Sequence, residues 1–158
     1  MPSLKLIPLY LLYLTTFGLA ALTKLSPLLK GWTGAPEWFQ KQFGETFLNA
    51  FPGALTLNFY FIALVETAVT VLFVLSLIRR EFLPGQKKSY LLFGLLVAQL
   101  GFVMLGIGLR VSQDFHGAAE LFFYFGVTLI ASRYVEDQFR LESLSVTNFG
   151  NQVSRESN

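Results

Sequence analysis

Four long apolar stretches alternate with short polar connections along the chain. They cover residues 4–25, 57–78, 89–109 and 115–134. Each has about the 20 residues that an α-helix needs to cross the hydrocarbon core of a bilayer. Four of the six prolines fall between the stretches: Pro27, Pro36, Pro52 and Pro84. The pattern predicts an all-α protein, a transmembrane four-helix bundle, because a soluble bundle would need more polar surface to cover four such runs.

The connection between the first two stretches has a helical pattern of its own. Phenylalanine recurs at every fourth residue, as Phe39, Phe43, Phe47 and Phe51. Residues 36–51 therefore predict an additional amphipathic helix in the first extracytoplasmic connection, ended by Pro52 and Gly53. We favour an interfacial anchor with Trp32 and Trp38 at headgroup depth. The alternative is a helix that caps a cavity in the bundle.

The distribution of lysine and arginine predicts the orientation. One side carries eight: Lys5, Arg79, Arg80, Lys87, Lys88, Arg133, Arg140 and Arg155. The other carries four: Lys24, Lys30, Lys41 and Arg110. The positive-inside rule places both termini in the cytoplasm. We expect one membrane domain over residues 1–137, whose first stretch is an uncleaved helix rather than a secretory signal, and a loosely ordered polar cytoplasmic tail over residues 138–158.

Composition supports the membrane assignment and narrows the chemistry. Apolar residues make up 53% of the 158 residues and charged residues 14%, with a mean hydropathy of +0.53. The chain has no cysteine and one histidine, so we expect no metal site, no haem and no iron–sulfur cluster in this chain alone. A net charge of +2 without a large basic cluster predicts no nucleic-acid binding. The expected partner is the lipid bilayer.

Six polar residues are candidates for ligand binding or proton handling: Glu66, His116, Glu120, Lys24, Arg110 and Gln99. Glu66 stands deep in the second stretch, where an unpaired ionisable group costs roughly a few kcal/mol. His116 and Glu120 are four residues apart and therefore neighbours on one helix. Lys24 and Arg110 have a similar expected depth, in the outer half of the bundle.

Two interpretations of these candidates stay open. The functional one is a polar pocket open to the outer face, in which Glu66 is buried and His116 and Glu120 exchange protons or hold a ligand. The structural one is an ion-pair network of Glu66 or Glu120 with Lys24 or Arg110 that only locks helices together. Gln99, near the middle of the third stretch, is more typical of an interhelical hydrogen bond than of a substrate contact.

Several motifs resemble the DoxX family of small membrane proteins. They are the run from Phe17 to Leu25 with its Lys24, the segment Ala63-Leu64-Val65-Glu66, and four short-linked spans. The segments from Pro36 to Gly53 and from Asp114 to Ala118 are similar to one DoxX-like subgroup. The resemblance covers about residues 9–134 and implies a four-helix integral protein of the bacterial cytoplasmic membrane.

Three functional hypotheses follow. The first, which we favour, is a non-catalytic accessory or assembly subunit of a membrane complex, bound to a membrane or redox protein or to a second copy of itself. The second rests on the resemblance, since some DoxX members are described as subunits of quinone-linked oxidation: an oxidoreductase subunit that binds a quinone in an outer pocket. The third is a small-molecule or lipid-binding membrane protein.

Overall fold

The computed structural model describes residues 6–29, 31 and 34–156, and for residue 28 and residues 141–156 it describes the backbone alone. All regular elements in this part of the chain are helices: α1 (Ile7–Tyr13), η2 (Leu14–Gly18), α2 (Leu19–Leu29), α3 (Glu37–Phe43), η3 (Phe47–Ala50), α4 (Ala54–Ile78), α5 (Ser89–Val111) and α6 (Phe115–Glu156). Lys5, Lys30 and Trp32 lie outside the described residues.

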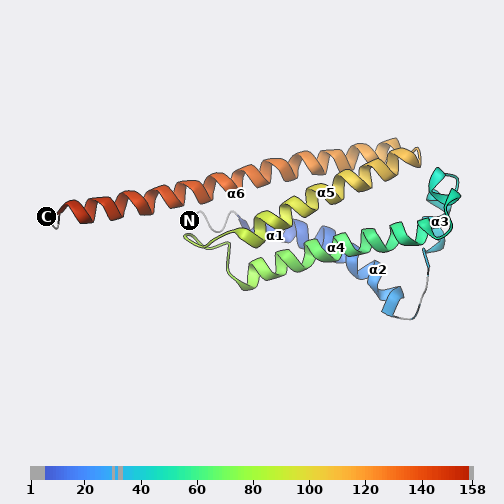
Figure 1. The fold of residues 1–158 in the computed structure, drawn as a ribbon, viewed down its shortest axis with the longest axis horizontal. Helices are drawn as coiled ribbons and strands as arrows, with labels where there is room; N and C mark the ends of the chain where they lie inside the picture. Colours follow the sequence, from blue (N-terminus) through green and yellow to red (C-terminus); the bar gives the residue numbers. More distant parts are fainter. Residues whose placement is uncertain (1–5, 30, 32–33, 157–158) are drawn as a thin grey trace.

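Four helical segments are long and apolar enough to cross a membrane. They run over Ile7–Pro27, Ala54–Ile78, Ser89–Val111 and Phe115–Arg140. α5 packs on both α4 and α6, while the first segment packs mainly on α4. Both chain ends point to the same end of the bundle, and α3 lies at the opposite end (Figure 1). The predicted transmembrane four-helix bundle is confirmed in its fold class.

The first segment is a single run of helix with a π-helical turn inside it. α1, η2 and α2 follow one another without a break, and η2 is the π turn. Each residue of a π turn advances through a smaller angle than in an α-helix, so the buried face moves by about one position. It comprises Tyr10, Tyr13, Phe17 and Ala21. Pro27 lies inside α2 rather than after it, so the expected end of this helix at residue 25 is too early.

The aromatic connection forms two short helices instead of one helix over residues 36–51. α3 ends at Phe43, and the single 3-10 turn η3 begins at Phe47. The carbonyl of Gln40 accepts a hydrogen bond from the Gly44 nitrogen at 2.7 Å, which closes the last turn of α3. The predicted aromatic face is therefore divided, because Phe39 and Phe43 are buried while Phe47 and Phe51 are exposed.

Close approach of α4, α5 and α6 depends on small residues. A Cβ at Gly94 would lie 3.0 Å from the ring of Phe73, which is fully buried. At the α5–α6 corner, Asp114 Oδ1 accepts a hydrogen bond from the Gly117 nitrogen at 2.9 Å and starts α6. A Cβ at Gly117 would lie 2.8 Å from Asp114 Oδ2. These contacts explain why glycines lie on these helix faces.

A buried carboxylate organises the α4–α5 connection. Glu81 accepts hydrogen bonds from the backbone nitrogens of Tyr90 at 3.1 Å and Leu91 at 2.8 Å, which are free donors in the first turn of α5. Ser76 Oγ also donates to Glu81, at 2.8 Å, so the Tyr10 hydroxyl, 2.6 Å away, donates to Ser76. The first segment, α4 and α5 are thereby tied together at this end.

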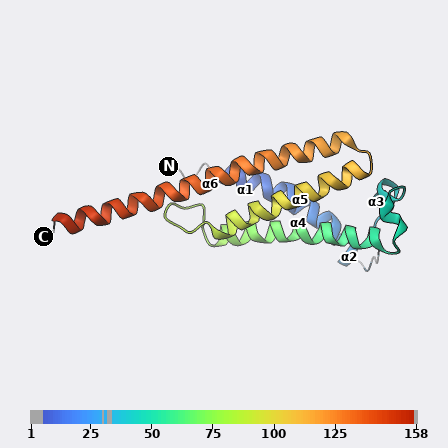
Figure 2. The same ribbon diagram turned by 45° about the horizontal axis from the view of Figure 1, so that its top comes forward.

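The last helix does not stop at the membrane boundary. α6 has 42 residues and continues through most of the segment expected to be loosely ordered. It projects beyond the bundle as one rod (Figures 1 and 2). Residues 138–149 contain no proline or glycine, so nothing in their backbone chemistry interrupts the hydrogen-bond ladder. Polarity alone was therefore a poor indicator of loose order.

Candidate functional site

An ion pair between the first segment and α4 is the main polar feature within the described bundle. Lys24 Nζ donates to Glu66 Oε1 and Oε2, each at 2.8 Å. The side chains are only 14% and 7% exposed. The two residues are 42 positions apart in sequence, so the pair ties α2 to α4. The structure therefore pairs the two residues on which the family resemblance depends most.

The two helices position this pair by different means. Glu66 lies on the buried face of α4 with Ala63 and Val69. Lys24 continues the buried face of the first segment after Ala21, and Gly18 lies near enough to α4 that a Cβ there would contact Thr70 at 3.6 Å. This close approach is what allows the lysine side chain to reach the carboxylate from a neighbouring helix.

Next to the ion pair is a cavity of about 170 Å³, which we call the capped cavity. Lys24 lines it together with side chains of α3, η3, α4, α5 and α6. A small extension of about 10 Å³ shares Phe61, Ile62, Met104 and Leu105 with it and reaches Glu66. The ion pair therefore stands at the inner end of the capped cavity, beneath α3.

Aromatic side chains form the cap. Phe39 and Phe43 pack against each other with ring centroids 4.6 Å apart, and Phe39 also contacts the ring of Phe59 at 5.5 Å. Trp38, 55% exposed, completes the rim. The two interpretations of this connection therefore apply to different residues. Phe39 and Phe43 on α3 cover a cavity, as a cap would, whereas the exposed Phe47 and Phe51 are available to a membrane interface, as an anchor would be.

Hydrogen-bonding groups also face the capped cavity. The ammonium of Lys24 has three N–H donors, and both of its hydrogen bonds within the described residues go to Glu66. The amides of Gln42 and Asn58 line the same space, and the described residues offer neither of them a hydrogen bond. The walls are otherwise mostly apolar. The cavity thus combines flat apolar walls with a few directed N–H donors, as small-molecule sites do.

Four of the six predicted residues lie away from this site, and three of these are exposed. His116 and Glu120 approach each other at 3.4 Å between Nε2 and Oε1, but their side chains are 91% and 60% exposed. Arg110 is exposed and stacks over the ring of Phe115 at 4.8 Å. The expected convergence of five residues therefore reduces to Lys24 and Glu66, because the rotation of α5 and α6 directs the other side chains outward.

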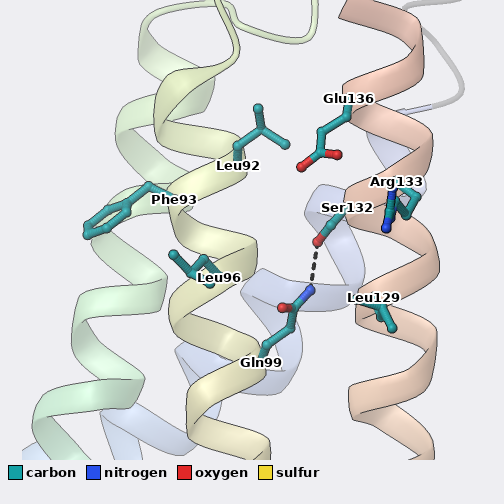
Figure 3. Close-up of a pocket in the computed structure, with 8 residues that line it drawn as sticks. All are labelled: Leu92, Phe93, Leu96, Gln99, Leu129, Ser132, Arg133 and Glu136. Atoms are coloured by element: carbon teal, nitrogen blue, oxygen red, sulfur yellow. Dashed lines mark hydrogen bonds between the residues drawn. The ribbon is translucent and has the colours of Figure 1, made fainter.

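Gln99 belongs to a different feature, a groove between α5 and α6 that we call the α5–α6 groove. Its amide nitrogen donates to Ser132 Oγ at 2.8 Å, as Figure 3 shows. Ser132 in turn donates to the carbonyl of Thr128 at 2.9 Å. This is the interhelical hydrogen bond that the sequence indicated for Gln99. The residue contributes nothing to the lining of the capped cavity.

Sequence reasoning missed Gln42 and Asn58 as cavity residues and Glu81 as a buried group. Gln42 and Asn58 lie in or beside a connection whose path the sequence does not fix. Glu81 follows Arg79 and Arg80 in a charged connection and was not among the candidates. One signal was present: a carboxylate in the connection before a helix, here eight residues before Ser89, can accept hydrogen bonds from the free nitrogens of the first turn.

No three His, Cys, Asp or Glu side chains among the described residues form a group that could hold a metal ion. Comparison of the chain with protein-family models, with curated proteins and with solved structures finds no match in any of the three.

Proposed function

We propose that the protein is a DoxX-like accessory subunit of the bacterial cytoplasmic membrane, with both termini cytoplasmic, that holds a small amphipathic molecule in the capped cavity. The observation that carries this proposal is the cavity itself, in which aromatic walls surround the Lys24–Glu66 pair. Binding is favoured over catalysis because the lysine and the carboxylate satisfy each other without a ligand. Orientation rests on the lysine and arginine distribution.

The donor set favours a ligand with carbonyl-type acceptors on a flat apolar body. Lys24, Gln42 and Asn58 present N–H donors to the cavity, and Phe39 and Phe43 provide ring faces. A quinone has both properties, and when bound it would itself supply the redox chemistry. In this proposal the chain's own residues bind and orient the molecule and exclude water from it.

Quenching of tryptophan fluorescence tests the binding proposal. Trp32→Phe leaves Trp38, at the rim of the capped cavity, as the single tryptophan. We expect titration of the detergent-solubilised protein with menadione, a short quinone, to quench Trp38 saturably. Asn58→Leu should weaken the apparent affinity about tenfold, or about 1.4 kcal/mol, because it removes a donor without disturbing the ion pair. Lys41→Met, on the exposed side of α3, is the matched control and should leave the affinity unchanged.

Quenching that rises linearly with menadione, or that is equal in the Asn58→Leu protein, would show that the capped cavity is not the binding site. Mass spectrometry of protein purified gently from native membranes then tests the accessory role. A stoichiometric partner protein is expected, and its absence at every detergent strength contradicts that part of the proposal.

A quinone-linked oxidoreductase subunit is the second candidate, and the position of Glu66 favours it. Lys24 Nζ holds protons at the cavity, and the carboxylate oxygens 2.8 Å behind it can accept one. Glu66→Gln keeps the shape of the side chain but removes the proton acceptor. If the role is redox, this variant should still quench with menadione while quinone-dependent oxidation in membrane vesicles falls at least tenfold. An unchanged oxidation rate would contradict the redox role and favour the accessory role.

A further inference from the structure

The α5–α6 groove opens on the side of the bundle, away from the capped cavity. It has a volume of about 370 Å³ and begins at Leu92, three residues after the start of α5. It reaches inward to Gln99, near the middle of that helix. Its walls are exposed apolar side chains: Phe93, Leu96 and Leu129. Since both helices are membrane spans, the space is open to lipid, in the leaflet next to the α4–α5 connection.

Polar groups are arranged in order along this groove. Glu136 faces Leu92 near the mouth, Arg133 lies one turn deeper on α6, and the hydrogen-bonded Gln99 and Ser132 lie deeper still (Figure 3). Leu129 lies at about the level of Gln99 (Figure 3). The α6 wall of the groove thus changes from charged to polar with depth, while Leu92, Phe93 and Leu96 make the α5 wall apolar from the mouth inward (Figure 3).

Arg133 is an exposed arginine near the membrane boundary. It lies in the last third of the Phe115–Arg140 segment, whose 26 residues span about 39 Å and so exceed the roughly 30 Å hydrocarbon core, which places Arg133 near the headgroups. Within the described residues Arg133 has no ion pair and no hydrogen bond from its side chain. A charged side chain at such a position is costly unless it reaches a headgroup or a partner. An arginine is also well shaped to bind phosphate with two N–H groups.

We propose that the α5–α6 groove binds one phospholipid with a phosphoethanolamine headgroup. Arg133 pairs with the phosphate and Glu136, the neighbouring charge on α6, pairs with the primary ammonium. Gln99 keeps one N–H beyond the one given to Ser132, and a lipid ester carbonyl accepts it. The acyl chain lies along Leu96 and Leu129. Glu136, Arg133 and Gln99 follow one another along the groove in the order in which such a lipid presents its ammonium, its phosphate and its ester (Figure 3).

Charge complementarity distinguishes this headgroup from the other common ones. A phosphoglycerol headgroup carries only the negative phosphate. It has no cation to pair with the carboxylate of Glu136, which would repel it. A phosphocholine headgroup has a quaternary ammonium with no N–H to donate. Of these three headgroups, only the zwitterion with a primary ammonium satisfies both Arg133 and Glu136 by charge-assisted hydrogen bonds.

Native mass spectrometry of the full chain tests the proposal. The protein is released from nanodiscs that contain phosphatidylethanolamine, phosphatidylglycerol and phosphatidylcholine in equal amounts, and the lipids that stay bound are identified. We expect one phosphatidylethanolamine per chain. Arg133→Gln should reduce its retention roughly tenfold, or about 1.4 kcal/mol. Glu136→Gln should change the preference from phosphatidylethanolamine to phosphatidylglycerol, because it removes both the ammonium partner and the repulsion of the anion.

Arg110→Gln is the control, since Arg110 is an exposed arginine near the opposite end of α5 and outside the groove. It should retain the lipid as the unmodified protein does, and circular dichroism should give equal helix content for all variants. Equal retention of the three lipids, retention of none, or a lipid-free dimer would each overturn the proposal. A Glu136→Gln protein with unchanged preference would do the same. None of these results depends on the capped cavity.

Discussion

The Lys24–Glu66 pair allows a quantitative test of how the bundle is held together. Both side chains are nearly buried, at 14% and 7% exposure, and both carboxylate oxygens lie 2.8 Å from Nζ. Removing one partner of a buried pair leaves the other charge uncompensated and costs about 3–5 kcal/mol. We therefore expect Lys24→Met and Glu66→Met each to lower the free energy of unfolding by about 3 kcal/mol.

The double variant should behave differently from the sum of the two. With methionine at both positions no charge remains, and two unbranched apolar side chains fill the space between α2 and α4. Replacement of a whole buried pair by apolar residues is often neutral or stabilising. We expect the double variant to lie within about 1 kcal/mol of the unmodified protein, which gives a coupling energy far above the roughly 0.5 kcal/mol of independent sites.

Unfolding in mixed micelles, followed by far-ultraviolet circular dichroism as the fraction of sodium dodecyl sulfate rises, measures these differences. Lys41→Met and Glu120→Met are matched controls at exposed positions and should each change the free energy by less than about 0.5 kcal/mol. Additive effects of the two single substitutions, or single variants as stable as the controls, would refute the conclusion that the pair is coupled and buried in the membrane-embedded protein.

Three other properties can be tested in the same way. Gly94→Ala should destabilise the protein by about 1–3 kcal/mol, because its Cβ would lie 3.0 Å from a fully buried phenylalanine ring, whereas Gly126→Ala, with open space around it, should be neutral or stabilising in the same unfolding assay. Glu81→Ala should lower the free energy of unfolding by about 2 kcal/mol, because it removes the acceptor for two backbone nitrogens of α5. Amide hydrogen exchange in the first turn of α5 should become faster. Unchanged exchange would contradict the role of Glu81 as a cap of this helix. In the cysteine-free background, an impermeant maleimide should label His116→Cys in intact cells and Gln86→Cys only after permeabilisation, and the opposite result would reverse the predicted orientation.

The spans were predictable because apolar runs and proline positions report directly on burial in lipid. Their ends were less so. Pro27 lies within the last turns of α2, and the π turn moved the buried face by about one position, so that it includes Ala21, since a local insertion in helix winding leaves no mark in the apolar pattern. α6 continued past residue 137, where residues 138–149 contain no proline or glycine that would interrupt the helix.

The candidate site was predictable only for Lys24 and Glu66. These two residues could be recognised as candidates because an ionisable residue inside an apolar span costs free energy, so its presence indicates a structural or functional role. The outward directions of His116 and Arg110 depend on helix rotation, which one sequence does not fix. The capped cavity exists because α3 folds back over the bundle. This depends on a tertiary contact between Phe39 and Phe59, which are 20 positions apart in sequence.

The rod formed by the end of α6 also acts as a lever. Sixteen residues of continuous helix separate Arg140, where the apolar span ends, from Glu156, which is about 24 Å at the helical rise per residue. A change of about 10° in the tilt of α6 within the bilayer would therefore displace its tip by about 4 Å. Because α6 forms one wall of the α5–α6 groove, any change of tilt that accompanies filling or emptying of that space would be magnified at the far end of the helix.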